Sequence, residues 1–281
     1  LENIQVAEMD DQATPAVPAS GKLRFYAKSL GGRMMLRQLG PSGLSTPLQP
    51  SFFQNFITFI GPSSGTSLSA IGNTLTSVGT ISHPNPTEAY GYMANIVTSA
   101  TVNTSAGTGT AGALWLRGDL GGGGFFFAAR FVLPDASYDE TGASTGTRIF
   151  VGMTNLSMAG VVSSNLPAGS HAGFHRLHVN GSTLDANWFF LTGSGTGTSR
   201  TDTGVAFLPG KIYDAYIFCA PSANVISWRI DNLTDDLTAS GETATQLPLS
   251  AAFLRAGIQL ATVNAVARNI RLQRIYIESD R

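Results

Sequence analysis

Charged side chains are scarce in this chain. Asp, Glu, Lys and Arg supply 12% of its 281 residues, against roughly a quarter in an ordinary soluble domain. Lysine occurs only at Lys22, Lys28 and Lys211, and the formal net charge is −1. The chain therefore has neither the basic field that attracts nucleic acid nor a block of acidic residues, and we expect no nucleic-acid partner.

Cysteine is almost absent as well. Cys219 is the single cysteine, so no disulfide can form within the chain and a disulfide-stapled scaffold is excluded. This residue lies in an apolar, strand-like run at residues 213–219, which predicts a buried core thiol. A nucleophilic cysteine would need polar, activating neighbours.

Long hydrophobic runs are missing too. No apolar stretch reaches the roughly 18 residues that indicate a transmembrane helix, and no basic start followed by an apolar core indicates a signal peptide. We therefore expect no membrane insertion. Because the chain begins with Leu1 rather than Met, we expect it to be the C-terminal piece of a longer protein.

Apolar and small residues dominate what is present. The chain is 43% hydrophobic and contains 32 glycines. No segment of about 12 residues or more shows the 3.6-residue period of an amphipathic helix. Strand-like runs separated by Gly-, Ser-, Thr-, Asn- and Pro-rich loops instead predict an all-β sandwich or barrel. The clearest runs are residues 89–97, 113–117, 124–133, 148–153, 174–179, 187–192, 212–219, 225–231, 254–262 and 269–278.

Two of these runs carry sharper predictions. Residues 125–133 are apolar at both strand parities, which predicts either a central strand covered on both faces or a subunit interface. In the last run, Ile270 and Leu272 share one parity whereas Ile275 and Ile277 share the other. A strand that places both pairs in the core needs a β-bulge near residues 273–274.

The N-terminal part divides into two segments. Residues 1–20 contain Pro15 and Pro18, which favour an extended linker. Residues 21–57 hold two strand-like runs on either side of a Gly-Gly turn, which is a hairpin signal. Since an isolated hairpin is marginally stable in water, we expect neighbouring chains to hold it. The predicted domains are therefore 1–20, 21–57 and a sandwich at 58–281.

Three of the four histidines lie close together, at His171, His175 and His178. A helix would bring all three to one face, as a metal site requires, but the flanking glycines favour a strand. On a strand, His171 and His175 share one face and His178 has the other. Neither face is cleanly apolar, so we predict a peripheral strand with histidines near solvent or a subunit seam. Only a three-fold axis could then gather histidines around a metal, and no metal or cofactor is predicted.

Acidic residues cluster in the loop at residues 134–146. Such a cluster is typical of a solvated loop, a cation site or the carboxylate pair of a glycosidase. Asp231 and residues 235–236 form a second acidic group, whose sequence predicts a turn between two strands. No nucleophile, base and acid occur together, so we predict a binding protein and not an enzyme. Three tryptophans inside strand runs are expected to be core anchors: Trp115, Trp188 and Trp228. The candidate receptor-binding residues are Asp135, Tyr138, Asp139, Glu140, His171, His175 and Arg200.

The N-terminal segment resembles the shoulder of tail-fibre proteins of tailed bacteriophages. The residues that carry the resemblance are 18–28, 33–37, 40–43 and 48–53. The pattern of residues 60–281 is similar to concanavalin-A-like lectin and glucanase sandwiches, through residues 125–133, 148–153, 212–219, 228–231 and 251–281. No catalytic motif is carried over by this similarity.

The resemblance implies a jelly-roll, concanavalin-A-like β-sandwich preceded by an extended linker and a small hairpin shoulder. It also implies a homotrimeric, extracellular tail-fibre fragment of the virion. Such a fragment would attach to upstream fibre proteins and bind a bacterial surface receptor, most simply a glycan. Two alternatives stay open at this point: a tailspike-type glycan depolymerase and a structural decoration or baseplate protein.

Overall fold

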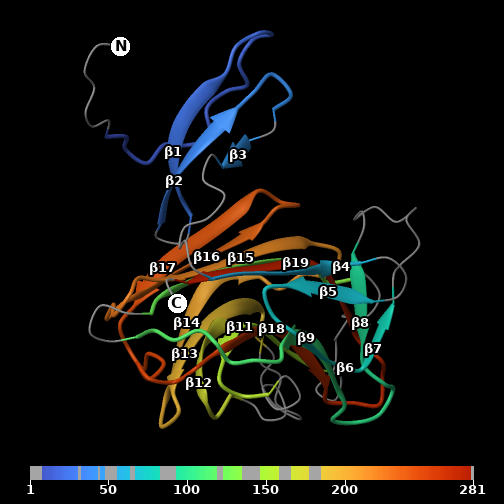
Figure 1. The fold of residues 1–281 in the computed structure, drawn as a ribbon. Helices are drawn as coiled ribbons and strands as arrows, with labels where there is room; N and C mark the ends of the chain where they lie inside the picture. Colours follow the sequence, from blue (N-terminus) through green and yellow to red (C-terminus); the bar gives the residue numbers. More distant parts are fainter. Residues whose placement is uncertain are drawn as a thin grey trace.

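The structure is a β-sandwich with a small sheet beside it (Figure 1). This computed structural model describes residues 8–30, 33–43, 45–47, 56–63, 67–82, 93–118, 123–134, 146–157, 166–176 and 185–279. Within those ranges every regular element is a β-strand, which confirms the all-β prediction. In the same ranges, no helix is long and apolar enough to cross a membrane.

The larger sheet has nine strands, in the order β17-β16-β15-β10-β19-β4-β5, with β8 also pairing with β19 and β7 with β8. All pairs within it are antiparallel. Its strands are β4 (Phe56–Pro62), β5 (Leu68–Ile71), β7 (Thr80–Ser82), β8 (Ala94–Val97), β10 (Phe125–Val132), β15 (Ile212–Cys219), β16 (Ile226–Asn232), β17 (Leu237–Thr243) and β19 (Asn269–Ser279).

The second sheet of the sandwich has seven strands, in the order β14-β13-β12-β11-β18-β9-β6. Its strands are β6 (Leu75–Val78), β9 (Ser105–Thr110), β11 (Thr147–Thr154), β12 (Ser170–Arg176), β13 (Asn187–Ser194), β14 (Thr198–Ala206) and β18 (Arg255–Thr262). The run expected at 113–117 forms only an isolated bridge, from Trp115 to Leu254. The run expected at 174–179 begins earlier, at Ser170.

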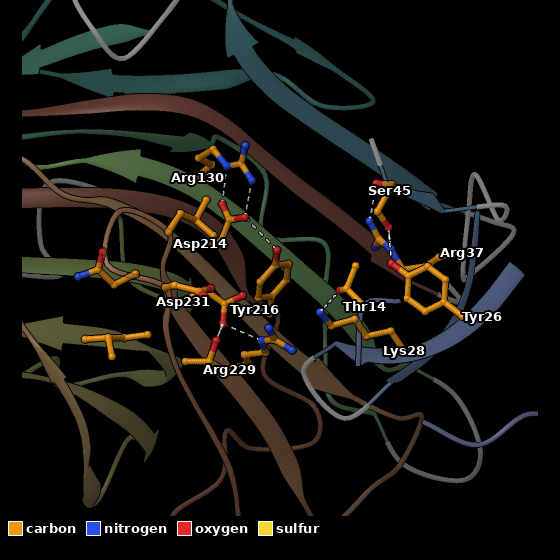
Figure 2. Close-up of a pocket in the computed structure, with 15 residues that line it drawn as sticks. Thr14, Tyr26, Lys28, Arg37, Ser45, Arg130, Asp214, Tyr216, Arg229 and Asp231 are labelled. Carbon is orange, nitrogen blue, oxygen red and sulfur yellow. Dashed lines mark hydrogen bonds and ion pairs between the residues drawn. The ribbon is translucent and has the colours of Figure 1, made fainter. Parts of the chain in front are cut away.

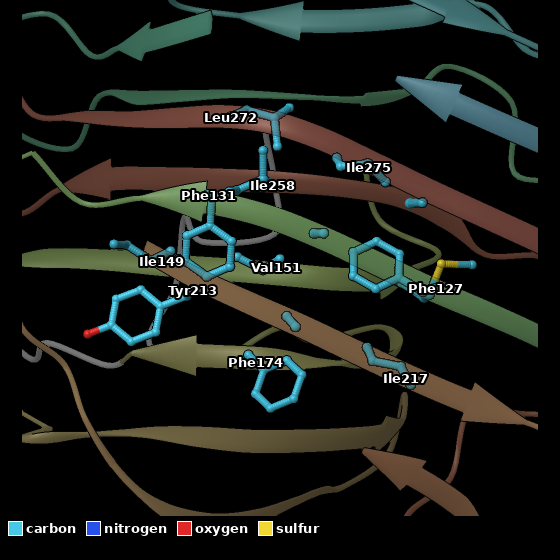
Figure 3. Packing of buried hydrophobic residues seen from close by; sticks show 14 of the residues in the cluster. Phe127, Phe131, Ile149, Val151, Phe174, Tyr213, Ile217, Ile258, Leu272 and Ile275 are labelled. Carbon is cyan, nitrogen blue, oxygen red and sulfur yellow. The ribbon is translucent and has the colours of Figure 1, made fainter. Parts of the chain in front are cut away.

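One apolar core fills the space between the two sheets (Figure 3). Phe127 and Phe131 of β10 point into it, opposite Val151 of β11 and Ile258 of β18. Period-2 alternation explains this, because every second residue of each strand faces the partner sheet. All three tryptophans and Cys219 are buried, as predicted, and burial raises the pKa of the Cys219 thiol to about 12.

Strand β19 contains the predicted bulge. Arg130 of β10 pairs with Arg274 and Phe131 pairs with Leu272, so Gln273 is the extra residue. The bulge restores the inward direction of the side chains after it, and Ile270, Leu272, Ile275 and Ile277 are all fully buried in the core. It also divides the other edge of β19, which pairs with β8 before Gln273 and with β4 after it.

Deletion of Gln273 is expected to be tolerated, because it removes the bulge and leaves a regular strand. Without the extra residue, Ile270, Leu272, Ile275 and Ile277 share one parity, so all four still face the core opposite the same β10 residues. The contrasting variant is deletion of Tyr276, which lies between two inward residues of the regular part of β19; it should prevent folding, because it turns the side chains on one side of the deletion to the wrong face. Soluble yield and guanidinium unfolding measure both effects. A Gln273 deletion as damaging as the Tyr276 deletion would contradict the assignment of Gln273 as the extra residue.

Strand β10 is central and covered on both faces, which confirms that reading of residues 125–133. Its inward residues join the main core, whereas Phe126 and Ala128 form an outward cluster with Tyr216, Phe218 and Tyr276. Phe126 is 3% exposed. The outward face of the nine-stranded sheet is therefore partly a second apolar contact zone.

The small N-terminal sheet stands on this outward side of the nine-stranded sheet (Figure 1). It consists of β1 (Arg24–Leu30), β2 (Arg33–Leu39) and β3 (Ser45–Pro47). Asp11 of the preceding segment pairs in parallel with Ala27. Contacts with the sandwich include the guanidinium of Arg229, which donates to the Ser29 carbonyl, and Arg33, which lies over the Phe218 ring. The hairpin thus packs against its own chain, and its contact with neighbouring chains stays a prediction.

Candidate functional site

The predicted receptor-binding residues fall into two groups. The four loop residues lie outside the described part of the chain: Asp135, Tyr138, Asp139 and Glu140. The other three belong to the seven-stranded sheet, with His171 and His175 on β12 and Arg200 on β14. His178 also lies outside the described residues.

His171 and His175 share one face of β12, as the strand spacing predicts. Ala172 and Phe174 belong to the core between the sheets, so both histidines lie on the outward face of the seven-stranded sheet. The predicted peripheral position is wrong, however. Strand β12 lies between β13 and β11, and both histidines are 0% exposed.

Glycines in adjacent strands leave the space that the His171 and Phe150 rings occupy. A Cβ at Gly193 of β13 would lie 2.1 Å from Cε1 of His171, and a Cβ at Gly173 would lie 2.6 Å from the Phe150 ring. The two rings occupy the volume that these side chains would take, and they meet edge to face with centroids 6.3 Å apart. The residue pattern along one strand could not predict this space, because glycines of the adjacent strands leave it.

Replacing Gly193 with alanine is expected to destabilise the fold by about 1–3 kcal/mol, because the new methyl group overlaps the buried His171 ring. The double variant Gly193→Ala/His171→Ala should lose less stability than the two single changes added together. Guanidinium unfolding gives the three values. Gly40→Ala is the control, since its Cβ would meet nothing closer than 3.9 Å. Strict additivity would contradict the proposed overlap.

Burial keeps both imidazoles neutral. Desolvation, followed by the charges of Arg200, His171 and Arg148, lowers the pKa of His175 to about 3. Desolvation also lowers the pKa of His171 to about 4, against the opposing effect of the Gly169 carbonyl, which accepts a hydrogen bond from Nδ1 at 2.6 Å. Among the described residues, neither ring nitrogen of His175 has a hydrogen-bond partner.

The protein is expected to lose stability as the pH falls from about 6.5. Above that pH both histidines are neutral in the folded and unfolded chain. Below it the unfolded chain binds protons, whereas folded His171 and His175 do not until the pH nears 4 and 3. Each histidine therefore contributes a loss of roughly 1.4 kcal/mol per pH unit in this window. Unfolding at pH 7 and 5 measures the slope, which should be shallower in His175→Gln; equal slopes would contradict the assignment.

Polar residues gather where β13 meets the edge strand β14, beside the histidines. The Arg200 guanidinium lies 4.1 Å from the centroid of the Phe189 ring and pairs with Asp185 at 2.6 Å. The Asn187 side-chain amide donates to both carboxylate oxygens of Asp202, at 3.0 and 3.2 Å. Phe189 is also the cross-strand partner of His175 and of Asp202. We call these five residues the β13–β14 cluster: Asp185, Asn187, Phe189, Arg200 and Asp202.

Sequence reasoning found one member of this cluster, Arg200. Asn187 and Phe189 alternate with the core residues Trp188 and Phe190, so the outward face of β13 could have been read from the sequence. The β14 residues that lie opposite this face could not be predicted, because the register shifts between Asn187 and Phe189.

The second acidic group, at residues 231–236, forms the turn between β16 and β17, as predicted. Asp231 accepts hydrogen bonds from Arg229 and Thr238, and Asp235 pairs with Lys211 at 2.7 Å. Within the described ranges, no three His, Cys, Asp or Glu side chains come together as a metal site would require.

Comparison with known proteins gives the fold. No protein-family model matches the chain, and no curated protein matches it. Solved structures do match: the lectin UEA-II complexed with galactose is 12% identical, with a TM-score of 0.54 over 81% of this chain and 99% of that one. The chain has the concanavalin-A-like β-sandwich fold of the legume lectins. This confirms the predicted fold class.

Two further structures support the same assignment of fold. Basic winged bean lectin with Tn-antigen is 10% identical, with a TM-score of 0.54 over 80% of this chain and 98% of that one. A protein of unknown function from Shewanella oneidensis MR-1 is 15% identical, with a TM-score of 0.52 over 82% of this chain and 89% of that one.

Proposed function

We propose that this protein binds a glycan without cleaving it, and that the β13–β14 cluster takes part in the contact. The observation that carries the proposal is the arrangement of planar polar side chains around one aromatic ring, on the outward face of a lectin-like sheet. Fold likeness supports the ligand class, since the matching lectins were solved with galactose and with Tn-antigen.

The chemistry of the cluster suits a saccharide. Carboxylate, amide and guanidinium groups each offer two hydrogen-bonding atoms in one plane, which matches pairs of neighbouring hydroxyls on a sugar ring. Phe189 supplies an apolar surface beside them. Arg200 and Asp202 are both exposed and Asn187 is half-buried, so a ligand can reach their polar atoms from solvent.

The biological setting that we propose is a phage tail fibre attached to a bacterial surface. The resemblance of residues 18–53 to fibre shoulders supports it, as does the low charge of the chain. In that setting the protein is a homotrimer in the virion, joined to upstream fibre proteins, and three weak sites give a much stronger overall attachment. Light scattering at micromolar concentration should give a mass of three chains.

Binding to an array of bacterial polysaccharides tests the proposal. We expect wild-type protein to retain at least one glycan, and Asn187→Ala or Arg200→Ala to weaken that binding about tenfold or more, since each loses hydrogen bonds to the ligand. The control is Asp235→Asn, an exposed ion-pair residue on another hairpin. Retention that is unchanged in a double Asn187→Ala/Arg200→Ala variant would place the contact elsewhere.

Catalysis is measured on the same polysaccharides. We expect no release of reducing ends by the wild-type protein. Release that is abolished by Asp139→Asn or Glu140→Gln would instead support the depolymerase alternative.

A further inference from the structure

A cavity of about 270 Å³ lies between the N-terminal sheet and the outward face of the nine-stranded sheet (Figure 2). It is on the opposite side of the sandwich from the β13–β14 cluster. The volume is close to the lower end of small-molecule pockets, about 300–1,000 Å³. Seven charged side chains line it: Lys28, Arg37, Arg130, Arg229, Asp214, Asp231 and Asp236.

The N-terminal wall of the cavity is positively charged. The Lys28 ammonium donates to the Thr14 hydroxyl at 2.9 Å. The Arg37 guanidinium donates to the Ser45 hydroxyl at 2.9 Å and to the Ser45 carbonyl at 2.8 Å. Neither cation forms an ion pair with any described carboxylate. Two positive charges whose partners among the described residues are neutral therefore lie on one side of the cavity.

On the opposite wall, which the nine-stranded sheet forms, each arginine is paired with a carboxylate of the same wall. Arg130 binds Asp214 through two hydrogen bonds of 2.7 and 2.6 Å, and Arg229 binds Asp231 at 2.7 Å. Register explains the pattern, because Asp214 pairs with Arg130 on one side and with Asp231 on the other. Asp236 adds a further carboxylate to the same lining, so this wall has an excess of negative charge.

The pKa values of two tyrosines that line the cavity, one on each wall, are shifted in opposite directions. Burial raises the pKa of Tyr26, but hydrogen bonds with Ser45 and Thr14 and the charge of Arg37 lower it more, so that it lies below its ordinary value. Burial, followed by the charges of Asp214 and Asp231, raises the pKa of Tyr216. The cavity is thus positive at the N-terminal wall and negative at the sheet wall.

We infer that this cavity binds a small polyhydroxylated oxyanion, of which a uronate sugar is the simplest example. The carboxylate, sulfate or phosphate group would lie between Lys28 and Arg37, since charge-assisted hydrogen bonds to an oxyanion are the strongest that those donors can form. The sugar hydroxyls would then donate to the acidic side chains opposite. The inference does not depend on the β13–β14 cluster.

Isothermal titration calorimetry at low ionic strength tests the inference, with glucuronate, glucose 6-sulfate, glucose 6-phosphate, glucose and inorganic sulfate as separate probes. We expect at least one charged sugar to bind and glucose to bind at least tenfold more weakly. The charged sugar that binds most tightly identifies the oxyanion. Binding of inorganic sulfate as tight as that of every charged sugar would overturn the polyol part of the inference, and no binding by any charged sugar would overturn all of it.

Matched variants assign the binding to this cavity. Lys28→Met and Arg37→Gln should each weaken binding about tenfold or more, whereas Arg37→Lys, which keeps the charge, should retain most of it. Lys22→Met and Arg24→Gln are the controls, because both residues are exposed on the same segment and do not line the cavity. Unchanged affinity in Lys28→Met/Arg37→Gln would overturn the assignment. Asn187→Ala should leave this binding intact, which separates it from the proposed glycan contact.

Discussion

Strand β19 is the element on which the rest of the sandwich depends. It pairs with β10 along one edge and with both β8 and β4 along the other, so it joins the early strands of the chain to the late ones. A regular strand could not do this and keep Ile270 and Ile277 in the core together, because they have opposite parities. The bulge accommodates Gln273 as an extra residue, so the side chains on both sides of it keep the same inward and outward directions.

The outward faces are where the two sheets differ. On the nine-stranded sheet the outward residues of β10 and β15 are partly apolar, and the N-terminal sheet packs against that side. On the seven-stranded sheet the outward face instead carries buried histidines and a polar edge. The inner faces of the two sheets form the main core, so the outward faces can differ in chemistry from one sheet to the other. The two proposed binding sites lie on these two faces.

Features of single strands could be predicted from the sequence, whereas contacts between side chains of different strands could not. The bulge in β19, the central position of β10 and the turn at 231–236 could each be predicted, because every one depends on the order of residues along one strand. The burial of His175 and the ring contact of Phe189 with Arg200 could not. They depend on which strands lie side by side and in what register, and a register shift of one residue reverses every face. The four predicted loop residues lie outside the described part of the chain, so their role stays a prediction.

The distribution of charge argues that the cavity beside the N-terminal sheet has a function. The chain has 17 basic and 18 acidic residues, and seven of these 35 line this one cavity. Stability does not explain such a concentration, since ion pairs removed from water often contribute little compared with apolar side chains of similar volume. Asp214 and Asp231 are 4% and 8% exposed, beside an apolar cluster on the same face that could have been extended over them. A chain that avoids charge elsewhere but retains it at a hollow between two sheets is better explained by a polar ligand than by packing.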